Sequence, residues 1–134
     1  MAKEVGFAMT VTVDDSAGSG QAISNDVTSL DISTPRGTQD VTGVNKSAVE
    51  RLQLLSDASI TLNGAYNPAA NASHDVLSSW SVSSVPRTTV IAISGQTLST
   101  EMWVLNYDLN RAESGEQVWS APMELQDGTL PTWS

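Results

Sequence analysis

The chain is 134 residues long, carries fifteen acidic and six basic residues for a net charge of −9, and contains no cysteine. This length suits one domain with one core, whereas the absence of cysteine excludes a disulfide framework and a thiolate metal site. The scattered basic residues do not form the cationic cluster that nucleic-acid binding requires. The first residues lack the features of a secretory signal, and the longest apolar run, Val90 to Ile93, is too short to cross a membrane. We therefore expect a protein without a membrane anchor that folds in a cytoplasm.

The first part of the chain predicts β-strands. From Val5 to Val13 apolar side chains alternate with small or polar ones, which is typical of a strand with one buried face. Asp14 to Gly20 is rich in turn-forming residues. Gln21 to Thr34 then resumes a β pattern with a change of phase, which predicts a bulge or turn near Ser29. Pro35 to Gly37 indicates a turn or the start of a loop.

The middle of the chain contains one ambiguous segment. Ser47 to Leu55 has the spacing of a capping box and apolar residues at helical distance, yet it runs directly into Ser59 to Leu62, which alternates like a strand. The dipeptides Asn63-Gly64 and Asn67-Pro68 mark turns. Ser73 to Ser79 predicts a short helix that begins at a capping serine. Its apolar face consists of Val76, Leu77 and Trp80.

The last part returns to β-strands. Val90 to Ile93 suits a strand that is covered on both sides. Met102 to Leu109 alternates, with Trp103, Leu105, Tyr107 and Leu109 on the apolar side and Val104, Asn106 and Asp108 on a partly polar side. Arg111 to Gln117 predicts the long loop of a hairpin. In the strand Trp119 to Leu125, Pro122 cannot donate to a ladder and therefore predicts an edge position. About six strands with one short helix predict a mainly β fold, a sandwich or barrel, formed by a single domain over residues 1–134.

No motif predicts catalysis or a bound cofactor. His74 is the only histidine, and Asp75 is merely its neighbour in sequence, so we expect a surface residue and not a member of a triad. Asp14-Asp15 lacks the alternating carboxylates of a calcium loop and predicts a turn. Gly18 to Gly20 lacks the Lys-Ser/Thr that follows a phosphate-binding loop. We therefore expect a protein that is not an enzyme and that needs no metal.

Four tryptophans allow two interpretations, a sugar-binding platform or core packing. Trp103 and Trp119 lie on the apolar sides of their strands, which favours the core. Trp133, close to the C-terminus, could contact either a neighbouring subunit or its own domain, and the sequence does not separate the two.

An ordered set of residues resembles the signature of the major tail tube proteins of long-tailed, siphovirus-like bacteriophages. In that family a Val-Thr-Gly segment leads through a serine-containing loop to a Leu-x-Asp step, then to a strand that ends in a Gly-x-Tyr/Phe-Asn-Pro turn before a short helix. The resemblance is close over residues 30–80, and it favours loop and strand over helix for Ser47 to Leu55. The matching residues are Asp40, Val41, Thr42, Gly43, Ser47, Asp57, Asn63, Gly64, Asn67 and Pro68.

The resemblance implies a virion structural protein with a β-sandwich and one flanking helix. Six copies would form a ring, and rings would stack into the hollow tail tube that conducts double-stranded DNA from the capsid to the host cell, through an acidic lumen that does not bind DNA specifically. Other tail proteins would be partners, and assembly would take place in the cytoplasm of the host bacterium. Loops around residues 35–46 and 111–117 and the termini are expected to become ordered on assembly.

Two alternatives remain open at this point. One is a carbohydrate- or cell-wall-binding β-sandwich that uses its tryptophans. The other is a different virion component, such as a tail terminator or a capsid decoration protein.

Overall fold

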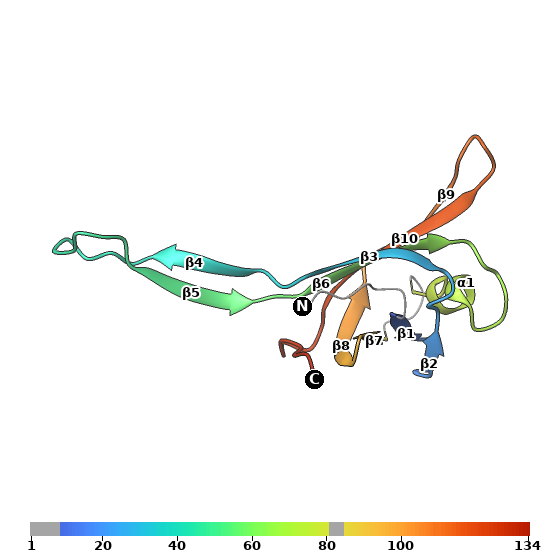
Figure 1. Ribbon diagram of the computed structural model, residues 1–134, viewed down its shortest axis with the longest axis horizontal. Helices are drawn as coiled ribbons and strands as arrows, with labels where there is room; N and C mark the ends of the chain where they lie inside the picture. Colours follow the sequence, from blue (N-terminus) through green and yellow to red (C-terminus); the bar gives the residue numbers. More distant parts are fainter. Residues whose placement is uncertain (1–8, 81–84) are drawn as a thin grey trace.

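A computed structural model describes residues 9–80 and 85–134, and this part of the chain is mainly β, as the sequence predicts (Figure 1). The described residues contain more strands than the six expected, because several short strands were not recognised in the sequence. No described helix is long and apolar enough to cross a membrane. The elements are β1 (Thr10–Asp14), β2 (Gly20–Ala22), β3 (Val27–Ser33), β4 (Arg36–Asp40), β5 (Arg51–Ser56), β6 (Ser59–Ala65), α1 (Ser73–Leu77), β7 (Arg87–Ile93), β8 (Gln96–Val104), β9 (Asp108–Arg111) and β10 (Gln117–Leu125).

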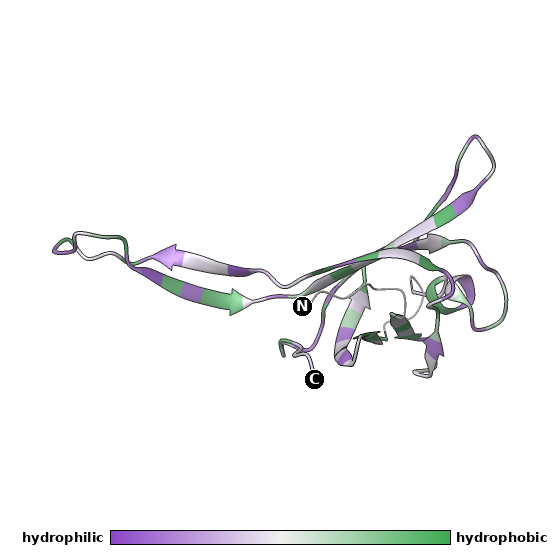
Figure 2. Ribbon diagram, in the orientation of Figure 1, coloured by the Kyte–Doolittle hydropathy of each residue, from purple (hydrophilic) through white to green (hydrophobic). Residues whose placement is uncertain are grey.

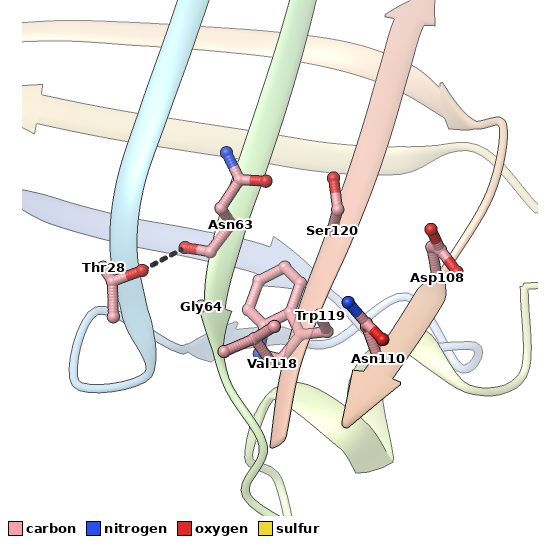
Figure 3. A pocket seen from close by; sticks show the side chains of 8 residues that line it. All are labelled: Thr28, Asn63, Gly64, Asp108, Asn110, Val118, Trp119 and Ser120. Atoms are coloured by element: carbon pink, nitrogen blue, oxygen red, sulfur yellow. Dashed lines mark hydrogen bonds between the residues drawn. The ribbon is translucent and has the colours of Figure 1, made fainter. Parts of the chain in front are cut away.

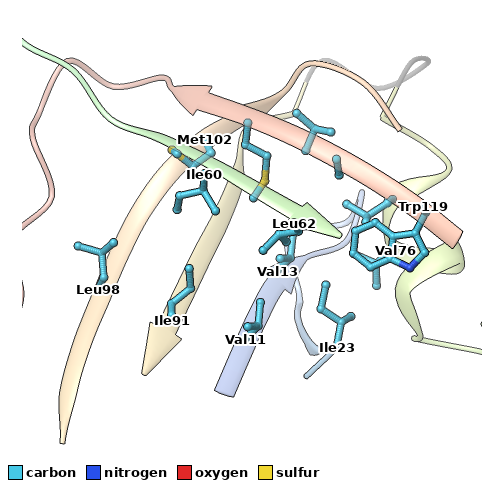
Figure 4. Close-up of a cluster of buried hydrophobic side chains, with 14 residues drawn as sticks. Val11, Val13, Ile23, Ile60, Leu62, Val76, Ile91, Leu98, Met102 and Trp119 are labelled. Atoms are coloured by element: carbon cyan, nitrogen blue, oxygen red, sulfur yellow. The ribbon is translucent and has the colours of Figure 1, made fainter. Parts of the chain in front are cut away.

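Most strands belong to one antiparallel sheet. Its order is β2-β1-β7-β8-β10-β6-β3, with β9 pairing with β10, while β4 and β5 form a separate two-stranded sheet. The large sheet curls, so that β1, β7 and β8 face β6 and β10 across the core (Figure 4). Each of these strands contributes every second side chain to that core, which is the alternation that its sequence predicts. The buried apolar residues of the core are Val11, Val13, Ile23, Ile60, Leu62, Val76, Leu77, Ile91, Leu98, Met102, Val104, Trp119, Ala121 and Met123.

The predictions for the first strands are confirmed where the structure describes them. Val11 and Val13 are buried on β1, whereas residues 5–8 of the predicted strand lie outside the described residues. The change of phase expected near Ser29 is present as a shift of the β3–β6 register between Val27 and Ser29.

The predicted edge position of the last strand is wrong. β10 lies inside the sheet, where it pairs with β6 on one side and with β8 and β9 on the other. The Pro122 carbonyl accepts the Leu105 N–H at 2.9 Å. The nitrogen and the carbonyl of a strand residue point to the same side, so the Pro122 ring nitrogen also faces the break between β8 and β9. No ladder donor is required at that position.

The helix is confirmed, but its predicted cap is wrong. Ala72 occupies the N-cap position without a side-chain hydrogen bond, and Ser73 is the first helical residue. The Ser73 N–H donates to Asp26 Oδ2 at 3.0 Å, and Asn67 Nδ2 donates to Asp26 Oδ1 at 2.9 Å. A buried carboxylate distant in sequence therefore replaces the local serine as the acceptor at the helix start.

Arg87 holds this helix against the sheet. The side chain is buried, and its Nη1 donates to the carbonyl oxygens of Val76 at 2.6 Å and Asp14 at 2.9 Å. One guanidinium therefore joins α1 to the end of β1 from its place on β7. The apolar face predicted for the helix packs into the core as expected, with Val76 and Leu77 buried and Trp80 partly buried against them.

Replacing Gly64 by alanine should lower the free energy of unfolding by about 1–3 kcal/mol. A Cβ atom on Gly64 would lie 2.1 Å from the Asp26 carbonyl oxygen and 2.6 Å from the Trp119 ring, so backbone and core would have to move apart. Denaturant unfolding measures the change. Gly37→Ala is the matched control, because its nearest neighbour would lie at 3.5 Å, and equal losses in the two variants would contradict the argument.

Candidate assembly surfaces

The β4–β5 hairpin projects far from the rest of the molecule (Figure 1). It continues the β3–β6 pair, because β4 begins shortly after β3 ends and β5 leads directly into β6. We call residues 36–56 the arm and the rest of the chain the body. The segment around residues 35–46, expected to be loop, is strand at Arg36–Asp40, because these residues pair with Arg51–Ser56. The segment Ser47 to Leu55, left between helix and strand, is loop followed by strand.

The arm carries exposed apolar side chains. All residues from 33 to 55 are exposed, including Leu55 at 94% and Val44 at 109% of the reference area. Figure 2 shows hydrophobic segments, in green, on β5 and in the loop of the arm. Clustered exposed apolar groups are characteristic of surfaces that bind another protein. The large apolar residues exposed on the arm are Val41, Val44, Val49, Leu52, Leu54 and Leu55.

Hydrogen bonds close the neck of the loop at the end of the arm. Asp40 Oδ1 accepts from the Thr42 N–H at 2.9 Å and from Thr42 Oγ1 at 2.5 Å, and Thr42 Oγ1 in turn accepts from the Glu50 N–H at 2.8 Å. The Val41 N–H also donates to the Glu50 carbonyl at 2.9 Å. We call Asp40, Thr42 and Glu50 the neck clamp. The Thr42 hydroxyl and then the Thr42 amide lower the pKa of the Asp40 carboxyl below its ordinary value.

The other signature residues lie at the joint and in the body. Asp57 stands where the arm meets the body, where its N–H donates to the Pro35 carbonyl at 2.9 Å. Gly64 and Asn67 contact Asp26, as described above, and so position β6 and α1. Asn63 lies on the outer face of β6, Pro68 is exposed after the strand, and Gly43 and Ser47 lie in the loop of the arm. The structure therefore does not bring the signature residues together into one site.

A second surface is the outer face of β3, β6, β9 and β10, which we call the polar face. The strand register places Asp31 opposite Thr61, Asn63 opposite Ser120, and Ser120 opposite Asp108. Glu124 points outward farther along β10. The charged strand residues of this face are all acidic, namely Asp31, Asp108 and Glu124.

A cavity of about 340 Å³ opens on the polar face (Figure 3). Its lining includes amides, hydroxyls and one carboxylate, together with Val118 and the buried Trp119 on its apolar side. These groups can hydrogen-bond to water or to a polar ligand, but the lining contains no cation that would hold a phosphate.

The predicted core position is confirmed for Trp119 but wrong for Trp103. Trp119 is 1% exposed, and its Nε1 donates to the Ala65 carbonyl at 2.9 Å. Trp103 is 38% exposed, whereas Val104, expected on a polar side, is buried. The alternation read from Met102 to Leu109 is interrupted, because β8 ends at Val104 and β9 starts only at Asp108.

Trp133 lies against its own domain through its backbone. It forms a bridge with Leu98, and the Ser134 N–H and carbonyl exchange hydrogen bonds with Thr97 at 3.0 and 2.8 Å. The indole remains 44% exposed. An inter-subunit contact of this ring stays a prediction.

The residues considered for catalysis have structural contacts. His74 Nδ1 lies 3.1 Å from the Tyr107 hydroxyl, and its ring stands edge-on to Tyr66. Burial raises the pKa of Tyr107 to about 12. Asp15 accepts the N–H groups of Ala17 and Ser19, so Asp14-Asp15 begins a turn. The described residues contain no group of three or more His, Asp or Glu that could hold a metal ion.

Comparison of the sequence with protein-family models found no match, and no curated protein matches it either. The fold, however, is similar to that of solved structures. A chain from the tail of an empty gene transfer agent particle with C6 symmetry has a TM-score of 0.78 at 19% identity, and the match covers 98% of this chain and 99% of that chain. A chain from the virion of a native gene transfer agent particle has the same TM-score and coverage at 17% identity. These likenesses show the fold over nearly the whole chain.

The neck clamp should make Asp40 titrate below the ordinary aspartate value of 3.8. Because the pKa of Asp40 is lower in the folded arm than in the unfolded chain, the clamp stabilises the folded arm at pH values above the unfolded pKa. This stabilisation is lost as the pH falls through the folded pKa. NMR titration of the Thr42 amide measures the midpoint. Thr42→Val should bring the midpoint back towards 3.8, and an unchanged midpoint in this variant would contradict the assignment.

Proposed function

We propose that this chain is the major subunit of a phage-like tail tube, a structural protein in which six copies form a ring and rings stack into a hollow tube. The observation that carries the proposal is the fold, which matches a chain from a C6-symmetric tail over nearly its full length. The arm supports it independently, because a protein that acts alone has no evident use for a long hairpin with exposed leucines.

The sheet also has edges that neighbouring subunits could cover. Among the described residues β2 pairs only with β1, β3 only with β6, and β9 only with β10. Unpaired edges favour aggregation unless they are protected or used in assembly. Lateral contacts through these edges would use them in a ring.

The polar face suits the wall of the channel. The arm extends β3 and β6 along their own direction, so an arm that reaches the next ring requires these strands to run along the tube. Their sheet then forms part of the wall, with either its core side or its polar side towards the lumen, and only the polar side is free. Six copies of Asp31, Asp108 and Glu124 would give eighteen carboxylates to each ring.

Such a wall would repel double-stranded DNA and prevent it from adhering in passage. DNA carries one negative charge per about 1.7 Å of its axis, and screening limits the repulsion to roughly 8 Å at physiological salt. Only carboxylates that line the lumen therefore contribute. The lining hydroxyls and amides of the cavity would hold water between the wall and the DNA.

The remaining parts of the proposal follow from this role. The protein would reside in the tail of the virion after assembly in the cytoplasm of a bacterial host, and other tail proteins would contact the ends of the tube. The exposed indole of Trp133 would contact an adjacent subunit. No catalytic activity is required for any of these roles.

Electron microscopy of the purified protein tests the proposal. We expect long tubes of stacked rings with six-fold symmetry, because rings whose two faces differ can add to one another without limit. Isolated rings would instead favour a tail terminator, and monomers that bind capsids would favour a decoration protein. A monomer whose tryptophan fluorescence is quenched by glycans would support the carbohydrate-binding alternative.

Reversing the charge of the polar face should slow the release of DNA without shortening the tube. Asp31→Lys and Asp108→Lys would place cations on the wall, where each can hold phosphate, so the release rate measured on particles should fall several-fold. Glu113→Lys, in the turn after β9 and away from the polar face, is the control for the same change of charge. Unchanged release in the wall variants would remove electrostatics from the mechanism.

A further inference from the structure

The cavity on the polar face lies where side chains of four strands, β3, β6, β10 and β9, come together (Figure 3). The strand register aligns Asn63, Ser120 and Asp108 in one row across β6, β10 and β9. Val118 and Asn110 belong to the next row, because residues two apart on a strand point to the same face. Neighbouring strands are about 4.8 Å apart, so a ligand that lies across them meets one polar side chain after another.

Several of these side chains have unused hydrogen-bonding capacity. Within the described residues the side chains of Asp108, Asn110 and Ser120 form no hydrogen bond, and Asp108 forms no ion pair. Asn63 Nδ2 donates to Ser29 Oγ at 3.4 Å, which leaves the Asn63 amide oxygen as an acceptor. The cavity therefore presents a row of oxygen acceptors that can bind donors of a ligand.

The charge of the lining selects cations. The described residues that line the cavity include one carboxylate and no Lys, Arg or His. Hydrogen bonds from an ammonium group to such oxygens are roughly twice as strong as those between neutral groups. The other charged strand residues of the polar face, Asp31 and Glu124, are acidic as well, so the surrounding surface also attracts cations. An anion such as phosphate would be repelled.

Val118 gives the cavity an apolar side. Its side chain is 41% exposed on a face that is otherwise polar, and the Trp119 ring lines the same cavity. A hydrated metal ion gains nothing from this surface, whereas methylene groups would be removed from water against it. The volume of about 340 Å³ is within the range of small-molecule sites. Acceptors beside an apolar patch fit ammonium groups that are carried on an aliphatic stem.

We propose that this cavity binds a linear aliphatic polyamine, a small organic polycation such as spermidine. A terminal ammonium group pairs with Asp108, and the next nitrogens donate to Ser120 and Asn63 along the row. The methylene groups between the nitrogens lie on Val118. A polyamine suits the row better than a single amine, because its nitrogens recur along the molecule and meet successive acceptors. The site goes beyond the proposed function, since it belongs to the single chain.

Binding would change the charge of the polar face. A triamine carries as many positive charges as there are charged strand residues on this face, namely Asp31, Asp108 and Glu124. In the proposed tube, on which this consequence alone rests, a bound triamine would offset the repulsion between wall and DNA. The concentration of polyamine would then regulate how freely DNA passes.

Equilibrium dialysis of the full chain against labelled spermidine tests the site, because it serves monomers and assemblies alike. At physiological ionic strength we expect one saturable site per chain. Asp108→Asn should weaken binding about tenfold, because it removes the carboxylate of the lining. Glu124→Gln is the matched control, because it removes the same charge from the same face outside the cavity, and it should weaken binding by about twofold or less. Equal weakening in both variants would show diffuse attraction to an acidic surface and overturn the proposal.

A second pair of variants leaves the charge unchanged. Asn110→Leu replaces an amide of the lining and should weaken spermidine binding several-fold, whereas Asn106→Leu, exposed outside the lining, should not. Neither side chain has a hydrogen-bond partner within the described residues, so both variants should unfold at the wild-type temperature. Equal affinity in the two variants would contradict a site in this cavity.

Competing ligands identify the chemistry. Putrescine should displace labelled spermidine, whereas butanediol, which has the same stem without charge, should not. Equal displacement by Mg²⁺ at matched ionic strength would overturn the proposal in favour of unspecific attraction, and displacement by a monosaccharide would overturn it in favour of a neutral polar ligand. Protein that binds spermidine but forms no tubes would contradict the tail tube and leave the site intact, whereas tubes that bind no spermidine would overturn this inference alone.

Discussion

The contact between Trp119 and Gly64 fixes in the body the strand from which the arm continues. The indole ring lies so close to the glycine backbone that no side chain fits between them, and its N–H is bound to the next carbonyl along β6. This contact fixes β6 against β10, and β6 continues through a short joint into β5. A buried aromatic ring in the body thus holds the strand that leads into an exposed hairpin. The same glycine approaches Asp26, which receives the start of α1, so core, helix and arm depend on one small region.

Much of the body could be predicted from the sequence, because the information there is local. Alternation of apolar residues identifies β1 and β10, a continuous apolar run identifies β7, and the change of phase near Ser29 identifies the bulge in β3. The errors arise where contacts with a distant part of the chain determine the position or the hydrogen bonds of a residue. Pro122 lies inside the sheet because the chain happens to break opposite to it, and Ser73 loses its capping role to Asp26. Trp103 and Val104 exchange their expected sides because both belong to β8, whose buried side is that of Leu98, Thr100 and Met102.

The arm was harder to foresee than the core. Its strands have no buried face, so the alternation that identifies other strands is absent, and Arg36–Asp40 reads as loop. The segment from Asp40 to Gly43 resembles a known signature, but this resemblance does not predict the role of the segment. The clamp needs Glu50 as the partner of Thr42, and a backbone N–H eight residues away leaves no mark in the sequence. The exposed apolar side chains and the hydrogen-bonded neck of the loop became visible only in the structure.

The continuity of β3 with β4 and of β5 with β6 has a mechanical consequence. In a stacked tube, tension along the axis would pull these paired strands past one another and would load their ladder hydrogen bonds in shear, since such bonds lie perpendicular to the strands. Bonds loaded in this way share the force, whereas a ladder pulled open from one end breaks one bond at a time. In the proposed tube, the contacts between subunits would therefore give way under tension before the fold of each subunit does.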